Sequence, residues 1–301
     1  MISILILTKN EQQDLPGCLE SVQWSDDVHV FDSYSTDATV EIARAAKARV
    51  SSRPSGQSDL LFGGNEAEHK NWALRNLRFR YKWVLHLDAD ERVTAELAMR
   101  MREAVQSPGA NVAFRVQRRD FFLGQWLKHV QASPFYIRLF RPEKITYQRL
   151  VNPVSIAEGP VGEVSGYLDH FPFSKGVSHW ADRHNSYSTL EAQQILKNRS
   201  GNNLFSIRKA IFAKRFEERR FHQKEFFYRI PGRPLVKFAV LLFVKRGFLD
   251  GHAGFAYAVL QSFYEYMIVL KTRELAVSGG ARAPMLIEAG SRHGIAEPLA
   301  E

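Results

Sequence analysis

Short apolar runs alternate with helical patterns over the first hundred residues of this chain. Residues 2–7 form a continuous apolar run, which is typical of a strand buried on both faces. Further strands are expected at 28–31 and 83–87, and helices at 10–22, 38–48 and 66–77, with Thr36 or Ser35 as the cap of the helix at 38–48. The segment 51–64 is rich in Ser and Gly and is expected to be a loop. Strands that alternate with helices form a parallel sheet with right-handed crossovers. The sequence therefore predicts an α/β fold with a mostly parallel sheet and helices on both of its faces.

The segment 83–92 carries two carboxylates at the point where a strand should end. Asp88 and Asp90 project to the same side, because side chains alternate along an extended chain. Two hard oxygen ligands at this edge suit Mg²⁺ or Mn²⁺, with a diphosphate completing the coordination shell. The alternative is an acidic turn into the next helix, with Asp90 or Thr94 as its N-cap.

Size and cysteine content limit the class of protein. With 301 residues, 45% of them hydrophobic, the chain can bury a large core. One cysteine, Cys18, excludes an internal disulfide framework and a cysteine-rich zinc site, and it favours a reducing compartment. The first residues show no basic segment or cleavage site of a secretion signal, and no apolar run reaches the roughly 18 residues of a membrane span.

The pattern changes after about residue 111. Short strands with Gly and Pro between them are expected at 112–122, 136–140, 145–148 and 164–171, which indicates an antiparallel or mixed extension of the sheet. Helix follows after Trp180, through 185–198. The last residues, 276–301, are rich in Ala, Gly and Pro, and a disordered tail is expected there.

Residues 199–275 form a basic, aromatic helical region. Thirteen Lys or Arg stand against three Glu between Arg199 and Arg246, whereas the rest of the chain is close to neutral. Apolar stretches at 235–244 and 255–270 are too short to span a bilayer and suit helices lying on an anionic membrane surface. The alternative is that they pack on the α/β domain with a solvated basic face. No nucleic-acid-binding module is recognisable.

Four separated motifs resemble the family 2 glycosyltransferases, which have the GT-A fold. They are Leu-Thr-Lys-Asn-Glu at 7–11, the Asp-rich turn at 30–39, the Lys-Asn-Trp-Ala-Leu helix at 70–74 and Leu-Asp-Ala-Asp-Glu-Arg at 87–92. Three later segments, at 138–141, 179–188 and 247–251, are similar to a bacterial subgroup related to lipopolysaccharide-core glucosyltransferases. The resemblance implies a GT-A catalytic domain over 1–198, with a nucleotide-sugar half at 1–110 and an acceptor half at 111–198.

The resemblance also implies roles for individual residues. The residues expected to bind the donor are Thr8, Asn10, Glu11, Asp32, Ser35, Lys70, Asp88, Ala89 and Asp90. Among them, Asp88 and Asp90 would hold the divalent metal that bridges the diphosphate leaving group. The residues expected to contact the acceptor or phosphate are Arg138, His179, Trp180 and Arg183. Structural alternatives remain open for several, such as a solvated helix charge for Lys70.

The general base is where the chain departs from the resemblance. Inverting transfer needs a carboxylate near the acceptor hydroxyl, and the related subgroup implies a His-Glu pair after the Arg-Leu-Phe-Arg strand. Here the corresponding stretch, 149–154, has no acid. The nearby candidates are Glu163 and then Glu158, which flank the turn at 159–162, whereas Asp169 is expected to be structural.

The sequence as a whole predicts an inverting glycosyltransferase. It would move a sugar from a nucleotide-diphosphate donor, UDP by family analogy, to a glycan or lipid-linked acceptor in cell-envelope or lipopolysaccharide synthesis. The expected location is cytoplasmic, peripheral on the inner membrane. Two alternatives stay open: a nucleotidyltransferase, although 8–11 is not its Gly-rich loop, and a non-catalytic membrane-associated sugar-binding or scaffold protein.

Overall fold

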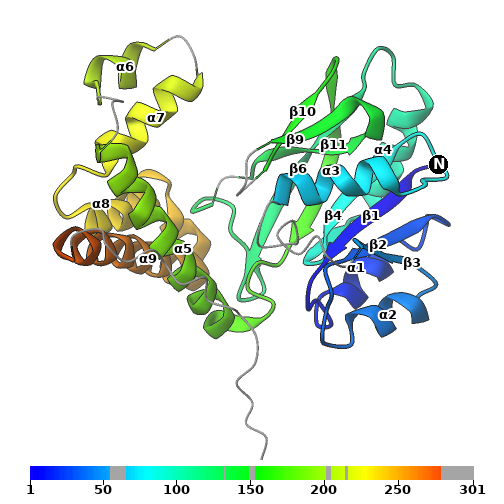
Figure 1. Cartoon of the computed structure of the whole chain (residues 1–301), viewed down its shortest axis with the longest axis horizontal. Coiled ribbons are helices and arrows are strands. Elements are labelled where there is room, and N and C mark those ends of the chain that lie inside the picture. Colours follow the sequence, from blue (N-terminus) through cyan, green and yellow to red (C-terminus); the bar gives the residue numbers. More distant parts are fainter. Residues whose placement is uncertain (55–65, 132, 149–152, 201–204, 214–215, 279–301) are drawn as a thin grey trace, which may run out of the picture. The chain divides into compact units, whose positions relative to one another are not determined.

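The structure is a computed structural model that describes residues 1–54, 66–131, 133–148, 153–200, 205–213 and 216–278 (Figure 1). The chain divides into two compact units. The first comprises residues 1–183 with 235–262, and the second comprises residues 184–234 with 263–301. Each unit is described by itself below.

A mixed, mostly parallel sheet forms the centre of the first unit. Its strand order is β3-β2-β1-β4-β8-β6-β11-β5, with β7 paired to β6 alone. Their bounds are β1 Ser3–Thr8, β2 Val28–Asp32, β3 Arg49–Ser52, β4 Val84–Asp88, β5 Glu91–Val93, β6 Ala113–Phe122, β7 Gln125–Trp126, β8 Phe135–Phe140 and β11 Val161–His170. A separate antiparallel pair consists of β9 Ile145–Gln148 and β10 Val154–Ala157.

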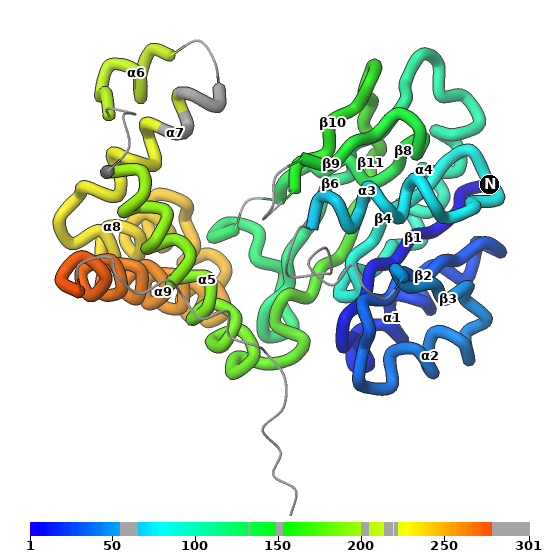
Figure 2. Tube along the Cα trace, viewed as in Figure 1, coloured from blue at the N-terminus to red at the C-terminus, as the bar shows by residue number. Residues whose placement is uncertain are grey.

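Strand direction decides which strand ends meet. β1 is parallel to β2 and β4, and β2 is parallel to β3. β8 is antiparallel to both β4 and β6, and β11 is parallel to β6; the tube in Figure 2 shows β4, β6, β8 and β11 grouped together although they are far apart in the sequence. The carboxyl ends of β1, β2, β4, β6 and β11 therefore lie at one edge of the sheet.

Helices cover both faces of this sheet, as the sequence predicted. On one face, Ile4 and Ile6 of β1 share a core with α1 Leu15–Ser21, α2 Thr39–Ala45 and α4 Ala95–Gln106. On the other face, Leu5 and Leu7 share a second core with α3 Glu66–Asn76 and with β9. The alternation of β1 side chains between two apolar cores explains why its sequence is apolar without interruption.

Several sequence predictions differ from the structure at the ends of elements. The helix expected at 10–22 begins only at Leu15, because the chain after β1 forms a loop in which Asn10 takes a left-handed backbone conformation with φ 56°. Ser35 and Thr36 do not cap α2, whose N-cap is Ala38 without a side-chain hydrogen bond. Thr94 does cap α4, since its Oγ1 accepts a hydrogen bond from the Leu97 backbone.

The strands β3, β5, β7 and β10 were not predicted. Each has two to four residues, which is too short for alternation to be recognised. β3 also falls partly in the segment 51–64 that was expected to be a loop; residues 55–65 lie outside the described residues.

Helices account for the rest of the described chain. They are α5 Gly176–Ser200, α6 Ile207–Phe212, α7 Phe216–Phe227, α8 Arg233–Ala239 and α9 Gly251–Val277, with a π-helical turn at Val240–Val244 and a 3₁₀ turn at Gly247–Asp250. In the second unit, Ile195, Tyr228 and Ile268 form a small core. α9 is longer than the helix expected at 255–270, and the predicted tail beyond 278 lies outside the described residues. Among the helices that the structure describes, none combines the length and the apolar character needed to cross a membrane.

Candidate active site

Polar side chains meet at the carboxyl edge of the sheet. Thr8, Asp32 and Asp88 end β1, β2 and β4. Asp120 and His170 stand opposite each other near the ends of β6 and β11. Ligands in open α/β sheets bind outside the carboxyl ends of the strands, so this edge is the candidate active site.

The Asp32 carboxylate is fixed by three hydrogen bonds. Thr8 Oγ1 donates to Oδ1 over 2.8 Å, and Ser35 donates its hydroxyl to Oδ1 over 2.6 Å and its backbone N–H to Oδ2 over 2.8 Å. Asn10 joins this group, because its backbone N–H donates to Ser35 Oγ and its Oδ1 accepts from the Thr36 backbone, each over 2.8 Å. The structure thus brings together four of the predicted donor-binding residues.

Glu11 is tied to a lysine that the sequence reasoning missed. Its Oε2 lies 2.8 Å from Nζ of Lys175, which also donates to the Asn10 carbonyl over 2.8 Å. Burial raises the pKa of Glu11 to about 7, and the Lys175 ammonium only partly opposes that shift. Lys175 follows the end of β11, and no motif in the sequence singles it out.

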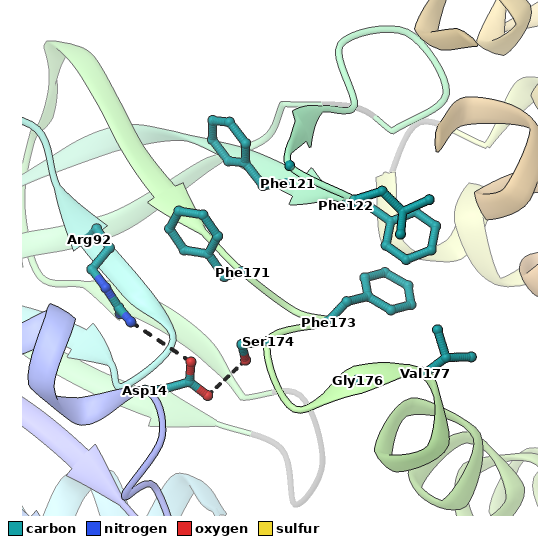
Figure 3. Close-up of a pocket in the computed structure, with 11 residues that line it drawn as sticks. Asp14, Arg92, Phe121, Phe122, Phe171, Phe173, Ser174, Gly176 and Val177 are labelled. Atoms are coloured by element: carbon teal, nitrogen blue, oxygen red, sulfur yellow. Dashed lines mark hydrogen bonds and ion pairs between the residues drawn. The ribbon is translucent and has the colours of Figure 1, made fainter. Parts of the chain in front are cut away.

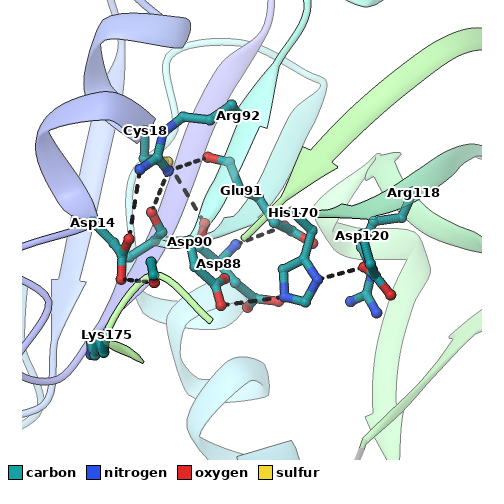
Figure 4. Close-up of polar contacts among 12 residues, drawn as sticks. Asp14, Cys18, Asp88, Asp90, Glu91, Arg92, Arg118, Asp120, His170 and Lys175 are labelled. Atoms are coloured by element: carbon teal, nitrogen blue, oxygen red, sulfur yellow. Dashed lines mark hydrogen bonds and ion pairs between the residues drawn. The ribbon is translucent and has the colours of Figure 1, made fainter. Parts of the chain in front are cut away.

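Asp88 and Glu91 (Figure 4) form an ion network with the buried Arg138 side chain. Arg138 Nη2 donates to Asp88 Oδ2 over 2.7 Å and also to the Glu91 carboxylate, while the Asp88 backbone N–H donates to Glu91 Oε2 over 2.9 Å. Burial acts to raise the pKa of Asp88, but the charges of Arg138 and Lys70 outweigh it and hold that pKa well below its usual range. Arg138, predicted as an acceptor or phosphate contact, lies in this network.

Asp90 is positioned by a second chain of contacts that the sequence reasoning missed. His170 Nε2 lies 3.3 Å from Asp90 Oδ2, and His170 Nδ1 lies 2.6 Å from Asp120 Oδ1. Arg118 and Gln131 hold Asp120 from the other side, at 3.1 Å and 3.0 Å. Their positions near the ends of predicted strands were the available signal for both Asp120 and His170.

Lys70, on α3, is predicted to contact the donor. Burial lowers its pKa, and the nearby Asp88 carboxylate opposes that shift. Its Nζ lies 5.4 Å from the centre of the Tyr147 ring. Lys70 is therefore half-buried near Asp88 and Tyr147.

The carboxylates of Asp88 and Asp90 are the predicted oxygen ligands of a divalent cation. Their side chains are 37% and 23% exposed, so both are accessible from the sheet edge. Within the described part of the chain, no cluster of three or more His, Cys, Asp or Glu is arranged to hold a metal ion. Two protein carboxylates leave coordination positions for phosphate oxygens and water, which is how Mg²⁺ is commonly held in phosphate-binding sites.

The two predicted general bases are not brought to this edge. Glu163 is exposed near the start of β11, seven residues before His170, which is roughly 20 Å along a strand. Glu158 lies before β11, where its backbone N–H bonds to Lys144. Because β11 runs parallel to β6, both carboxylates lie toward the opposite edge from Asp90. Asp169 pairs with Arg119, as expected of a structural residue.

The predicted acceptor residues of the first turns of α5 have different surroundings. His179 is exposed, whereas Trp180 is buried and stacks on Phe173 with ring centres 5.9 Å apart. Arg183 is half-buried, and its Nε has no hydrogen-bond partner. Trp180 therefore packs beneath the segment that follows β11.

The fold and the site are typical of α/β enzymes that bind a ligand at the carboxyl ends of parallel strands. The family model described as glycosyl transferase family 2 matches residues 3–159, which is more than half of the chain. The chain therefore belongs to the family 2 glycosyltransferases, with the predicted GT-A type of α/β fold, and it uses a nucleotide-sugar donor. This result sets aside the predicted alternatives of a nucleotidyltransferase and a non-catalytic protein.

Relatives of this chain are bacterial. An uncharacterized glycosyltransferase of Rickettsia typhi is 23% identical over 92% of this chain and 88% of its own length. A lipopolysaccharide core biosynthesis glycosyltransferase of Rhizobium meliloti is 28% identical over 64% of this chain and 71% of its own. Among solved structures, the glucosyl-3-phosphoglycerate synthase of Mycobacterium tuberculosis with Mn²⁺ and UDP-glucose is 21% identical, covers 40% of this chain and 44% of its own, and gives a TM-score of 0.33.

His69 makes the stability of the first unit dependent on pH. It is fully buried, stacks on Phe31 at 4.5 Å, and its Nε2 lies 3.1 Å from Ser33 Oγ. Burial, with the charges of Arg53 and Lys70, lowers its pKa to about 4. In the unfolded chain the pKa is about 6.5, so the unfolded state takes up the proton first and stability falls as pH drops from about 6.5 to 4.

Between pH 7 and pH 4, the free energy of unfolding should fall by about 3 kcal/mol less in the variant His69→Gln than in the wild type. Urea unfolding at several pH values measures this difference. His252→Gln, which changes an exposed histidine, serves as the control and should keep the wild-type slope. Equal slopes for the wild type and His69→Gln would contradict the assignment.

Proposed function

We propose that this glycosyltransferase moves a sugar with inversion from a nucleoside diphosphate donor, UDP first among the candidates, to a glycan or lipid-linked acceptor of the bacterial cell envelope. The observation that carries the proposal is the convergence of two acidic centres on one sheet edge: the Asp32 group at the ends of β1 and β2, and the Asp88–Asp90 pair after β4. The relative from Rhizobium meliloti, named for lipopolysaccharide core biosynthesis, supports the acceptor class.

In this proposal different residues bind different parts of the donor. Asp32, held by Thr8 and Ser35, accepts a hydrogen bond from the base or ribose, and Asn10 shapes the same pocket. Asp88 and Asp90, with Ala89 between them, would hold Mg²⁺ or Mn²⁺, which would supply positive charge for the diphosphate leaving group. Lys70 adds a further positive charge near the diphosphate.

The reaction exchanges one bond for another at the sugar. The bond from the anomeric carbon to the diphosphate oxygen breaks, and a bond to the acceptor hydroxyl oxygen forms on the opposite face. The hydroxyl proton passes to a base, and negative charge builds on the diphosphate. Positively charged groups that are fixed before the reaction stabilise such charge best. Arg138 and His170 fix the two aspartates that would hold the cation, through contacts of 2.7 Å and 3.3 Å.

Titration calorimetry tests the donor assignment. We expect UDP to bind the wild-type protein in the presence of Mn²⁺, and binding to weaken at least tenfold when Mn²⁺ is replaced by a chelator, since the diphosphate then loses the cation that would neutralise its charge. GDP is titrated in parallel to compare the bases. Folded protein that binds UDP equally well without the metal would contradict the proposed role of Asp88 and Asp90.

An exposed apolar patch in the first unit supports binding to an anionic membrane surface. Its large side chains are Leu235, Phe243, Val244, Phe248 and Leu249, which are 46–75% exposed. Lys237, Lys245 and Arg246 interrupt the patch. Contiguous exposed apolar surface marks an interaction site, and basic residues beside it suit lipid phosphates.

The patch is held rigidly on the first unit. Asp250 accepts hydrogen bonds from the backbone N–H groups of His129 and Val130 at 2.9 Å and 2.7 Å. We expect the protein to co-sediment with vesicles containing phosphatidylglycerol more than with neutral vesicles, and Phe243→Ser/Val244→Ser to reduce binding at least tenfold. Leu190→Ser, at a residue 51% exposed in the second unit, is the control. Equal sedimentation of patch variant and control would contradict the assignment.

A further inference from the structure

A pocket of about 500 Å³ opens beside the candidate active site in the first unit (Figure 3). Its lining comes from the end of β6, from the segment after β11 and from the start of α5. Phe121, Phe122, Leu123, Phe171, Phe173 and Val177 supply its apolar side chains. None of these residues belongs to the predicted donor site, and the reaction as described above does not use the pocket.

Two aromatic pairs build its walls. Phe121 stacks on Phe171 with ring centres 5.2 Å apart, and Phe122 lies against Phe173 at 4.1 Å. Leu123 and Val177 add apolar side chains that are 59% and 46% exposed. Apolar side chains that were needed only for the core would close on one another, whereas here they surround an open space of ligand size.

The polar residues of the lining are already engaged with one another. Ser174 Oγ donates to Asp14 Oδ2 over 2.8 Å, and Arg92 Nη2 lies 3.8 Å from Asp14 Oδ1. The Arg92 guanidinium also lies 5.6 Å from the centre of the Phe171 ring. A sugar in this pocket would need hydrogen-bond partners for its hydroxyl groups, so the lining favours an apolar ligand.

The pocket adjoins the acidic edge of the sheet. The Phe171 backbone N–H donates to the Asp90 carbonyl over 2.9 Å. Arg92, two residues after Asp90, lies on the same side as Asp14 and Phe171 in Figure 3. An elongated apolar ligand that lies against Phe171 therefore has one end next to the residues proposed to hold the donor diphosphate.

The pocket also adjoins the exposed apolar patch. Phe122 belongs to the same buried cluster as Leu241 and Tyr257, and Phe173 packs against that cluster. Leu241 lies in the π-helical turn that also carries the exposed Phe243 and Val244. Apolar side chains thus continue from the proposed membrane-binding surface to the wall of the pocket.

We propose that this pocket binds an apolar hydrocarbon chain, acyl or isoprenoid, of the acceptor, and that it holds the attached polar group beside Asp90. This inference rests on the proposed function for the existence of an acceptor, but it assigns a new site and the chemical class of the ligand. Burial of the chain against four phenylalanines supplies the binding free energy through the hydrophobic effect.

Fluorescence titration with dansyl-labelled undecanoic acid, below its micellar concentration, tests the site on the full chain. Val177→Trp fills the pocket from its rim, and Leu123→Asn removes an apolar rim side chain at a left-handed position, φ 51°, that Asn tolerates. Val154→Trp makes the same change as Val177→Trp at a residue 41% exposed on β10. Circular dichroism in the far and near ultraviolet confirms that each variant is folded.

We expect saturable binding of one probe per chain to the wild type and to Val154→Trp, and binding at least tenfold weaker to Val177→Trp and Leu123→Asn. Binding that is unsaturable, or equal in all four proteins, would overturn the inference. The titration of UDP with Mn²⁺ separates this result from the proposed function. Wild-type protein that binds the probe but no UDP leaves the pocket in place and contradicts the donor proposal, whereas the reverse result contradicts the pocket alone.

Discussion

Replacing Arg138 by Met should lower the free energy of unfolding by about 3–5 kcal/mol. Arg138 is 7% exposed and pairs with two carboxylates, of which Glu91 is fully buried. Removing the guanidinium leaves the Glu91 carboxylate buried beside Asp88 with no cation between them, and burial raises the pKa of Glu91. The cost is the free energy of a buried charge without its partner. Urea denaturation at pH 7 measures it.

The double variant Arg138→Met/Glu91→Gln separates charge from packing. A neutral amide in place of the Glu91 carboxylate removes the unpaired charge, so the double variant should regain at least half of the lost stability. Arg80→Met is the matched control, because Arg80 pairs with Asp26 at 2.6 Å but both side chains are more than half exposed. That change should cost less than about 1 kcal/mol. A loss of similar size in Arg138→Met and Arg80→Met would show that the buried network does not stabilise the fold.

The sequence was most informative where a strand ends in an acid. Asp32, Asp88 and Asp90 each follow an apolar run, and a short run followed by a polar residue predicts both the strand and its end. Because parallel strands bring their carboxyl ends to the same edge, the predicted sheet already placed these residues together. The hydrogen bonds of Thr8 and Ser35 to Asp32 agree with that prediction.

Strand direction could not be read from the sequence, and it decided the outcome for the general base. The pattern at 164–171 predicts a strand, but the same pattern is compatible with either direction. An antiparallel strand beside β6 would have carried Glu163 to the edge that holds Asp90. The observed parallel pairing carries His170 there and Glu163 away from it.

Ion-pair partners that lie far apart in the sequence could not be predicted either. Arg138 and Glu91 are 47 residues apart, and Asp120 and His170 are 50 residues apart. A Glu directly after the Asp-Ala-Asp pattern looks like a local helix cap, and only the pairing of β4 with β8 brings Arg138 to it. Local patterns predict elements, whereas the choice of ion-pair partner depends on how the elements pack.

The largest effect on activity is expected for the two aspartates after β4. Asp88→Asn and Asp90→Asn should each lower the rate of sugar transfer or donor hydrolysis by about 100- to 1,000-fold, because a divalent cation contributes several kcal/mol to stabilising the leaving group. Asparagine keeps the shape of the side chain but removes the negative charge that attracts the metal. Release of UDP, in the presence of Mn²⁺, from a UDP-sugar that the wild type consumes measures the rate, and metal-dependent binding of UDP should be lost in parallel.

The variant His170→Gln should weaken metal-dependent UDP binding without abolishing it. It therefore distinguishes the predicted metal ligand Asp90 from the residue that positions it. His170 contacts Asp90 and Asp120, so its loss should weaken metal-dependent UDP binding about 10- to 100-fold, as for other residues that orient a metal ligand, and excess Mn²⁺ should restore part of the activity. Asp169→Asn is the matched control, since Asp169 precedes His170 on β11 but pairs with Arg119. It should retain metal-dependent UDP binding.

Full activity in Asp88→Asn and Asp90→Asn would remove the metal from the proposed reaction and leave the Asp32 group as the remaining support for the donor site.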